Sequence, residues 1–377
     1  MKLHAGDPIP WFNLPSADNP CYAFHSVAGR YVLLGFIGSA TRPEPQAALA
    51  AIAANRALFD DERACFFGIS VDPADREQGR LSPDLPGIRF LFDTTGAVCR
   101  DLGVIRRDAA TPEGPELFTP AWVLVDPMLR VIETRPLHEA EAILARLRAM
   151  PAPEAHAGTE VPPPVLVLPR IFEPELCRRL IAHYETRGGE PSGFMREVDG
   201  KTVGVFDPAM KRRRDCTIED EALRSAVRAR ILRRVVPELA KAHFFKATRM
   251  ERYIVACYDA ADGGHFAAHR DNTTSGTAHR RFAVTINLNA EEFEGGELRF
   301  PEYSQRSWRA PTGGAVVFSC SLLHQALPVT AGRRYAFLPF LYDEAAARQR
   351  EANNARLGDG IGAYRAAGPQ PSNSLSQ

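Results

Sequence analysis

The sequence predicts two domains of different classes: an α/β domain in the N-terminal half and a mainly-β domain, buttressed by helices, in the C-terminal half. A chain of 377 residues is longer than one hydrophobic core usually supports. Between the halves, residues 151–164 replace apolar periodicity with prolines and small residues, which is the composition of a linker. We therefore expect domains at residues 1–150 and 165–344, and a flexible C-terminal tail at residues 345–377.

The first domain alternates apolar runs with helical segments. The apolar runs are rich in β-branched and aromatic residues, and they predict strands. These runs lie at residues 31–37, 65–71, 89–92, 121–125 and 129–134, and the helical segments at residues 43–59 and 139–148. Alternation of this kind is typical of an α/β sheet.

The second domain has a different order of elements. A strand-like run at residues 165–168 precedes two long helical segments at residues 173–187 and 220–244. Six or seven short strand-like runs then follow, separated by turns that contain glycine or proline. Helices first and strands afterwards indicate an antiparallel β-sandwich or barrel supported by helices.

The composition is that of a globular protein in a reducing compartment. Apolar residues make up 45% and charged residues 24%, and 46 basic residues balance 46 acidic ones. This balance gives no sign of a nucleic-acid partner, and no apolar run has the length of a membrane helix. Seven widely spaced cysteines without a C-x-x-C pair argue against a disulfide framework or a zinc knuckle. Because the N-terminus also lacks the apolar core of a secretory signal, we expect a cytoplasmic protein.

A candidate metal site lies in the second domain. His269 and Asp271 are two residues apart, so an extended segment places both side chains on one face. A third ligand from the distant His324 would complete a two-histidine, one-carboxylate face and leave three open positions on an octahedral metal. The rival is a hydrolytic zinc site that uses His265, which precedes His269 at the spacing of a helical zinc pair. The glycines before His265 argue against a helix there.

An arginine follows the third ligand at the start of another apolar strand. Burying Arg334 on a strand is unfavourable unless the guanidinium binds an anion, and its two parallel N–H groups suit a carboxylate. Two further histidines, His243 and His279, lie in a helical stretch and in a polar loop, where we expect structural roles.

These residues resemble the prolyl 4-hydroxylase group of Fe(II)- and 2-oxoglutarate-dependent dioxygenases. The segment VACY followed by GGHFAAHRDN, the turn GGEL and the run HQALPVTAGRRY match the family's motifs over about 180 residues. The resemblance implies a double-stranded β-helix with Fe(II) on His269, Asp271 and His324. It also implies that 2-oxoglutarate chelates the metal and pairs with Arg334, that Tyr258 lines this pocket, and that O2 and ascorbate, the latter as reductant, take part.

One position departs from the family pattern. Where oxygen-sensing relatives place a tyrosine before Leu-Asn, this chain has Asn287, so the second partner of the far carboxylate is either Asn287 or Thr285. The carboxylate of Asp271 implies hydroxylation rather than halogenation, because a halogenase leaves that ligand position empty.

The N-terminal half resembles a peroxiredoxin, or more widely a thioredoxin-like domain. The entry segment GDPIPWF, the strand GRYVLLGF and the segment FTPAWVLVD carry this likeness. A peroxidatic cysteine belongs in the loop at residues 37–45, where a helix N-terminus lowers the pKa of a thiol, and none is present there. We therefore predict a redox-inactive fold, used for docking, substrate presentation or homodimer formation.

A basic cluster, Lys211 to Arg214, precedes the second long helical segment. Such a cluster is usually a solvated loop. Alternatively Arg212, Arg213 and Arg214 form a substrate entrance that attracts an acidic peptide or a carboxylated small molecule.

Three functional hypotheses follow. The first is a dioxygenase that hydroxylates an unactivated C–H bond of a peptidyl residue, proline by analogy, or of an amino-acid-like substrate, with release of succinate and CO2. The second is a protein that binds 2-oxoglutarate and senses oxygen with little turnover. The third is a peroxidase with a relocated thiol, for which Cys99 is the candidate.

Overall fold

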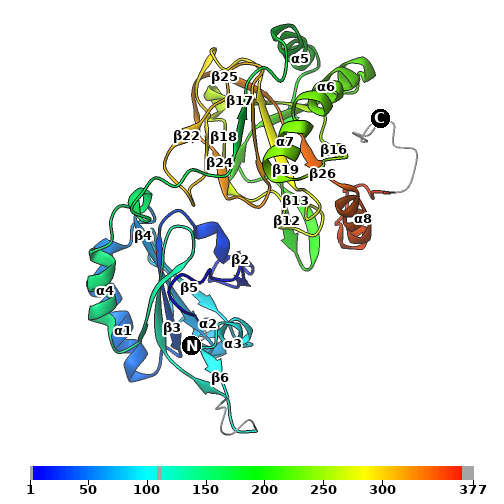
Figure 1. Ribbon diagram of the computed structural model, residues 1–377. Coiled ribbons are helices and arrows are strands. Elements are labelled where there is room, and N and C mark those ends of the chain that lie inside the picture. The colour runs from blue at the N-terminus through cyan, green and yellow to red at the C-terminus, as the bar shows by residue number, and fades with distance from the viewer. Residues whose placement is uncertain (1–2, 108–112, 367–377) are drawn as a thin grey trace. The chain divides into compact units, whose positions relative to one another are not determined.

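The computed structural model describes residues 3–107 and 113–366. The chain forms two compact units, residues 1–162 with 301–305, and residues 163–300 with 306–377 (Figure 1). Within the described ranges, no helix combines the length and the apolar character that crossing a membrane requires.

The N-terminal unit is built on a five-stranded sheet, which confirms the predicted α/β class. Strands β3, β4 and β5 are parallel, whereas β8 and β9 run antiparallel to the strands beside them. The strand order is β5 (Ile88–Phe92), β4 (Ala64–Ser70), β3 (Tyr31–Gly38), β8 (Ala121–Val125) and β9 (Val131–Pro136). Every residue of β3, β4 and β8 is buried, which explains why these strands are continuous apolar runs.

Helices α1 (Pro43–Ala54) and α4 (Ala140–Arg148) lie side by side against this sheet (Figure 1). Their apolar side chains enter the same core as the strands, among them Ile52 and Leu144. The two helices lie where the sequence predicts them.

The C-terminal unit contains two large antiparallel sheets, as the mainly-β prediction requires. The larger sheet follows the order β10 (Leu166–Leu168), β23 (Ala315–Ser319), β19 (Phe282–Asn287), β25 (Val329–Phe337), β17 (Ile254–Asp259), β15 (Arg214–Thr217) and β11 (Glu190–Pro191), with β16 (Arg249–Glu251), β20 (Phe293–Gly295) and β26 (Phe340–Tyr342) off this path. The smaller sheet is β14 (Lys211–Arg212), β18 (His265–His269), β24 (His324–Ala326), β21 (Leu298–Arg299) and β22 (Ser307–Trp308). Residues of both sheets line one common pocket, which is the arrangement of a double-stranded β-helix.

Helices cover the outer face of the larger sheet. Helices α5 (Pro174–Arg187), α6 (Glu221–Arg234) and α7 (Val236–His243) pack their apolar residues onto the sheet (Figure 1). In β17, Val255 and Cys257 belong to this core, whereas Tyr258 lines the inner pocket. The alternation of side chains along the strand thus separates a structural face from a functional one.

The region between α5 and α6 corrects the sequence analysis, which expects no strand there. It contains β11, the hairpin β12 (Phe194–Val198) and β13 (Lys201–Val205), and then β14 and β15. These strands are short and carry many charged residues, so their composition resembles that of a loop.

The expected flexible tail is also wrong over its first part. Helix α8 (Glu344–Ala352) begins at an Asp343 cap and is followed by a short 3-10 helix, η5 (Asn353–Arg356). Ala346, Ala347 and Tyr364 form a small buried cluster with Tyr342. Residues 367–377 lie outside the described residues.

Candidate metal centre

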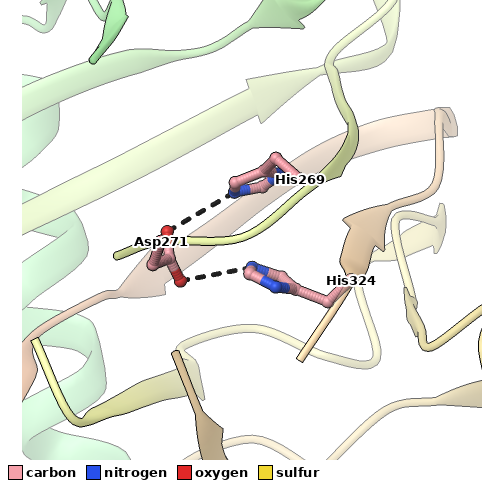
Figure 2. A group of neighbouring side chains, drawn as sticks. All are labelled: His269, Asp271 and His324. Carbon is pink, nitrogen blue, oxygen red and sulfur yellow. Dashed lines mark ion pairs between the residues drawn. The ribbon is translucent and has the colours of Figure 1, made fainter. Parts of the chain in front are cut away.

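Strand pairing brings the three predicted ligands together. His269 ends β18, and His324 begins β24, where it is the direct partner of His269 in the antiparallel register. Nε2 of His269 lies 3.5 Å from Oδ1 of Asp271, and Nε2 of His324 lies 3.3 Å from Oδ2 of Asp271 (Figure 2). In the part of the chain that the structure describes, this is the one group of three such side chains whose ligand atoms all lie within 4.8 Å of one another.

Backbone carbonyls fix the orientation of both imidazole rings. Nδ1 of His269 bonds to the carbonyl of Ala267 at 2.8 Å, and Nδ1 of His324 bonds to that of Leu322 at 3.0 Å. With Nδ1 occupied as a donor, each ring turns the lone pair of Nε2 toward Asp271. This is the outer-shell support that metal-binding histidines usually have.

The electrostatics of the site favour the protonation states that a metal needs. Burial and the neighbouring His269 lower the pKa of His324 to about 4. Burial opposes ionisation of Asp271, but His324 and His269 outweigh it and hold the pKa of the carboxyl well below its usual range. At neutral pH the site therefore offers a carboxylate and a neutral imidazole, the forms in which these groups bind metals.

The donor set fits iron(II). Two imidazole nitrogens and one carboxylate, close together on one side of a pocket, match the face that non-haem iron oxygenases present. A hydrolytic zinc site through His265 does not fit, because residues 265–269 form a strand. Both ring nitrogens of His265 also bond to backbone carbonyls.

The pocket beside the triad contains three of the four residues that the sequence analysis assigns to the co-substrate. Tyr258, Thr285 and Arg334 line it together with the three candidate ligands. Arg334 is 2% exposed, and its guanidinium lies 5.0 Å from the centre of the Tyr258 ring. Burial lowers the pKa of Arg334 from its usual value, because a low-dielectric surrounding disfavours the charged form.

Asn287 does not line the pocket, but it contacts Arg334. Its Oδ1 accepts a 3.2 Å hydrogen bond from Nε of Arg334, and its Nδ2 donates to the carbonyl of Ala310 at 2.8 Å. Asn287 is therefore placed to orient the arginine, which leaves Thr285 as the pocket-lining candidate of the two.

The GGEL turn passes close to the arginine. Gly296 has a φ of +70°, and a Cβ on it would lie 3.0 Å from Cδ of Arg334 and 2.9 Å from Cγ2 of Val329. Glycine is needed there both for its left-handed backbone and for the close approach.

The structure corrects the expectation for the basic cluster. Because side chains alternate along a strand, Lys211 and Arg213 point inward and are buried, whereas Arg212 and Arg214 are exposed. Arg213 lines the metal pocket, and all three arginines border a second cavity of about 540 Å³. Because two of its four residues are buried, the cluster is not a solvated loop, and its role as a substrate entrance stays a prediction.

Further pocket residues are not predicted from the sequence, among them Phe266 and Arg252. The ring of Phe266 stacks on His269 with centroids 3.5 Å apart, and Arg252 lines the pocket near the start of β17. Ile254, Ala256 and Tyr258 share one face of β17. Arg252 precedes the strand with a φ of +66°, so strand periodicity gives no signal for it.

In the N-terminal unit, two acidic side chains hold the loop in which a peroxiredoxin would carry its peroxidatic cysteine. Ser39 donates to Asp72 at 2.7 Å, and the backbone N–H of Ala40 donates to Asp75 at 2.9 Å. Asp75 also accepts a 2.7 Å bond from Ser70. This network fixes the loop without a thiol.

Cys99 lacks the properties of a peroxidatic thiol. It is buried, and burial together with Asp93 raises the pKa of its thiol far above the usual value. A reactive thiol needs the opposite environment, so the structure does not favour the peroxidase hypothesis.

The fold and the donor set define the C-terminal unit as a double-stranded β-helix with a two-histidine, one-carboxylate cluster. The sequence model of the 2OG-Fe(II) oxygenase superfamily matches residues 253–342, and that of the AhpC/TSA family matches residues 5–133. The chain therefore carries a 2OG-Fe(II) oxygenase domain on its C-terminal side and an AhpC/TSA, thioredoxin-like domain on its N-terminal side.

Relatives of the oxygenase part include PKHD-type hydroxylases. One from Azoarcus sp. is 31% identical over 123 residues, which are 30% of this chain and 52% of that protein. One from Shewanella baltica is 26% identical over 185 residues, which are 47% of this chain and 77% of that protein. The chain thus spans about half the length of the first relative and about three quarters of the second.

Solved structures resemble each half separately. A viral collagen prolyl hydroxylase from Paramecium bursaria Chlorella virus 1 is 18% identical, covers 47% of this chain and 94% of its own, and has a TM-score of 0.36. A peroxidoxin from Mycobacterium tuberculosis is 22% identical, covers 40% of this chain and 99% of its own, and has a TM-score of 0.33.

Proposed function

We propose that the C-terminal unit is an Fe(II)- and 2-oxoglutarate-dependent dioxygenase that hydroxylates an unactivated C–H bond of a peptidyl residue or an amino-acid-like molecule. His269, Asp271 and His324 hold the metal. The observation that carries this proposal is that a buried arginine, Arg334, shares one pocket with this triad.

When bound, iron(II) and 2-oxoglutarate supply the oxidising power, since reduction of O2 is coupled to loss of CO2 from the co-substrate and leaves succinate. The residues of the chain bind and orient. Arg334 pairs with the far carboxylate of 2-oxoglutarate, Asn287 keeps its guanidinium in place, and Thr285 offers a hydroxyl in the same pocket. Ascorbate serves as the external reductant.

Hydroxylase chemistry is supported by the relatives, whose names identify them as PKHD-type hydroxylases. The N-terminal unit, which has no cysteine in the loop at residues 37–45, contributes docking, dimer formation or substrate presentation rather than redox chemistry.

Anaerobic reconstitution tests the metal and co-substrate. Adding Fe(II) and 2-oxoglutarate to the full chain should give a visible charge-transfer band, and Asp271→Ala should abolish it. The matched control is Asp262→Ala, which removes an acidic side chain that is absent from the lining of the metal pocket. No band in the parent protein, or an unchanged band in Asp271→Ala, contradicts the proposal.

Turnover is tested in air with pools of peptides and of free amino acids. Succinate should form faster with a substrate present, and mass spectrometry should detect one added oxygen atom in that substrate. A protein that shows the band but never couples succinate to hydroxylation would be a binding or sensing protein instead.

A further inference from the structure

The metal pocket contains more positive charge than the co-substrate needs. Three arginines line it, Arg213, Arg252 and Arg334. Arg334 is assigned above to the far carboxylate of 2-oxoglutarate. The other two have no role in that assignment.

Arg213 and Arg252 share one carboxylate, that of Asp215. Arg213 donates from Nε and Nη2 to the two oxygens of Asp215 at 2.7 Å each, and Arg252 donates from Nη2 to Oδ2 at 2.9 Å. Two guanidiniums facing one carboxylate leave one positive charge uncompensated. The neighbouring acid Glu251 does not neutralise it, because Glu251 pairs with Arg280 at 2.7 Å and Arg350 at 2.8 Å.

The two arginines differ in what they can still bind. Arg213 is buried, with 4% of its side chain exposed, and it also donates from Nη1 to the hydroxyl of Tyr258 at 3.3 Å. The side chain of Arg252 is 28% exposed, and its bond to Asp215 uses one N–H of its five. Arg252 therefore keeps N–H donors that this bond does not use, at a residue that lines the pocket.

The backbone of Arg252 is held in an unusual conformation. Its φ is +66°, a region that residues other than glycine seldom adopt. This conformation lies just before β17, at a residue that lines the pocket. Burial and the facing Arg213 lower the pKa of Arg252 to about 10. Arg252 is still charged at neutral pH, and its lowered pKa reflects two cations that face one another.

Arg252 and Arg334 belong to different parts of the pocket. Arg334 is the direct strand partner of Tyr258, whereas Arg252 precedes β17 and lies six residues before Tyr258 in the chain. Arg334 bonds to Asn287 and lies over the Tyr258 ring. Arg252 instead bonds to Asp215 and lies over the Phe340 ring, 5.6 Å from its centre. With Arg334 committed to 2-oxoglutarate in the proposed function, an anion at Arg252 belongs to a second molecule.

We propose that Arg252, supported by Arg213 and Asp215, binds a carboxylate of the primary substrate, so that the hydroxylated molecule is a free amino-acid-like acid or a chain end rather than an internal peptide residue. This inference rests on the proposed function and narrows its substrate class.

The test uses the full chain loaded with Mn(II) and N-oxalylglycine, an unreactive analogue of 2-oxoglutarate, so that Arg334 is already occupied. Propionate is the carboxylate probe, and propionamide is its neutral counterpart. Mn(II) accelerates the nuclear relaxation of nearby protons, so the relaxation rate of the probe reports its binding beside the metal.

Propionate should show a saturable enhancement that exceeds that of propionamide by about tenfold. Arg252→Gln should reduce the propionate signal to that of the amide, and Arg252→Lys should restore part of it. Arg178→Gln, which changes an exposed arginine of α5, should leave it unchanged. Uptake of Mn(II) and N-oxalylglycine by each variant shows that the pocket is intact.

The inference is overturned if propionate gives no enhancement, if acid and amide behave alike, or if Arg252→Gln keeps the full signal because the probe binds the metal alone. A parent protein that takes up neither Mn(II) nor N-oxalylglycine overturns the proposed function and this inference with it.

Discussion

Nε of Arg334 donates a 3.2 Å hydrogen bond to Oδ1 of Asn287. The amide of Asn287 is itself held by its bond to the carbonyl of Ala310, and both side chains are buried. Asn287 stands where the oxygen-sensing relatives of the family pattern place a tyrosine. In this chain Asn287 orients the arginine, so under the proposed function it would contribute to co-substrate binding indirectly.

Replacing Asn287 with leucine should weaken 2-oxoglutarate binding. The change leaves Nε of Arg334 and the carbonyl of Ala310 without partners, and each unsatisfied buried group costs about 1–3 kcal/mol. We expect the Kd of 2-oxoglutarate to rise by about tenfold or more, measured anaerobically from the charge-transfer band. The affinity for Fe(II) alone should stay the same, and an unchanged Kd for 2-oxoglutarate would argue that Arg334 does not hold this ligand.

Lys211 should make the stability of the C-terminal unit depend on pH. Burial and Arg213 lower the pKa of Lys211 from 10.5 to about 5, and its Nζ donates to Ser192 and to the carbonyl of Gly193. Between these two pH values the unfolded chain keeps the proton and the folded chain does not. The unfolded state then binds more protons, so the free energy of unfolding rises with pH across this window.

Lys211→Met should remove that dependence. The slope of unfolding free energy against pH should fall by about 1.4 kcal/mol per pH unit between about pH 6 and pH 9. Chemical unfolding at several pH values, followed by a probe in the C-terminal unit, measures it. Lys201→Met, at an exposed lysine of β13, serves as the control. Equal slopes for the parent and Lys211→Met would refute the lowered pKa of Lys211.

The parts of this structure that the sequence predicts are those set by local pattern. Apolar runs predict the strands of the first unit, and the two-residue spacing of His269 and Asp271 predicts that their side chains share one face. Arg334 is a candidate from the sequence because a charged residue at the start of an apolar strand needs a partner.

The parts that sequence reasoning missed depend on pairing between distant strands. Residues 211–214 have the composition of a loop, and only pairing with β17 and β18 shows that Arg213 faces the pocket while Arg214 does not. Arg252 is not predicted from the sequence for the same reason, because its partner Asp215 lies far away along the chain. Helix α8 was missed because it is short and polar, with a buried face made of two alanines.

Thiol chemistry should be confined to a single cysteine. Cys21 is exposed, and the other six cysteines are buried, where apolar surroundings raise the pKa of thiols such as Cys65 to about 12. Titration of the native protein with a thiol-reactive disulfide should therefore show one fast-reacting group, which Cys21→Ser removes. Hydrogen peroxide consumption should be the same in parent and Cys99→Ser, and a drop in the variant would revive the peroxidase hypothesis.

Truncation should show that the C-terminal segment is part of the oxygenase fold. Arg350 of α8 pairs with the buried Glu251 at 2.8 Å, and Asn353 donates to the carbonyl of Ser275 at 2.8 Å. The backbone N–H of Gly358 bonds to Thr202 of the hairpin at 2.8 Å. A chain that ends at residue 344 loses all three contacts and leaves Glu251 with one cation fewer, at a cost of about 3 kcal/mol or more.

The thermal midpoint of the C-terminal unit should fall by several degrees, whereas a chain that ends at residue 366 keeps every described contact and should match the parent. Because Glu251 directly precedes Arg252 in the chain, the shorter chain should also lose propionate binding. Equal thermal midpoints for the two truncated chains would contradict the structural role of α8.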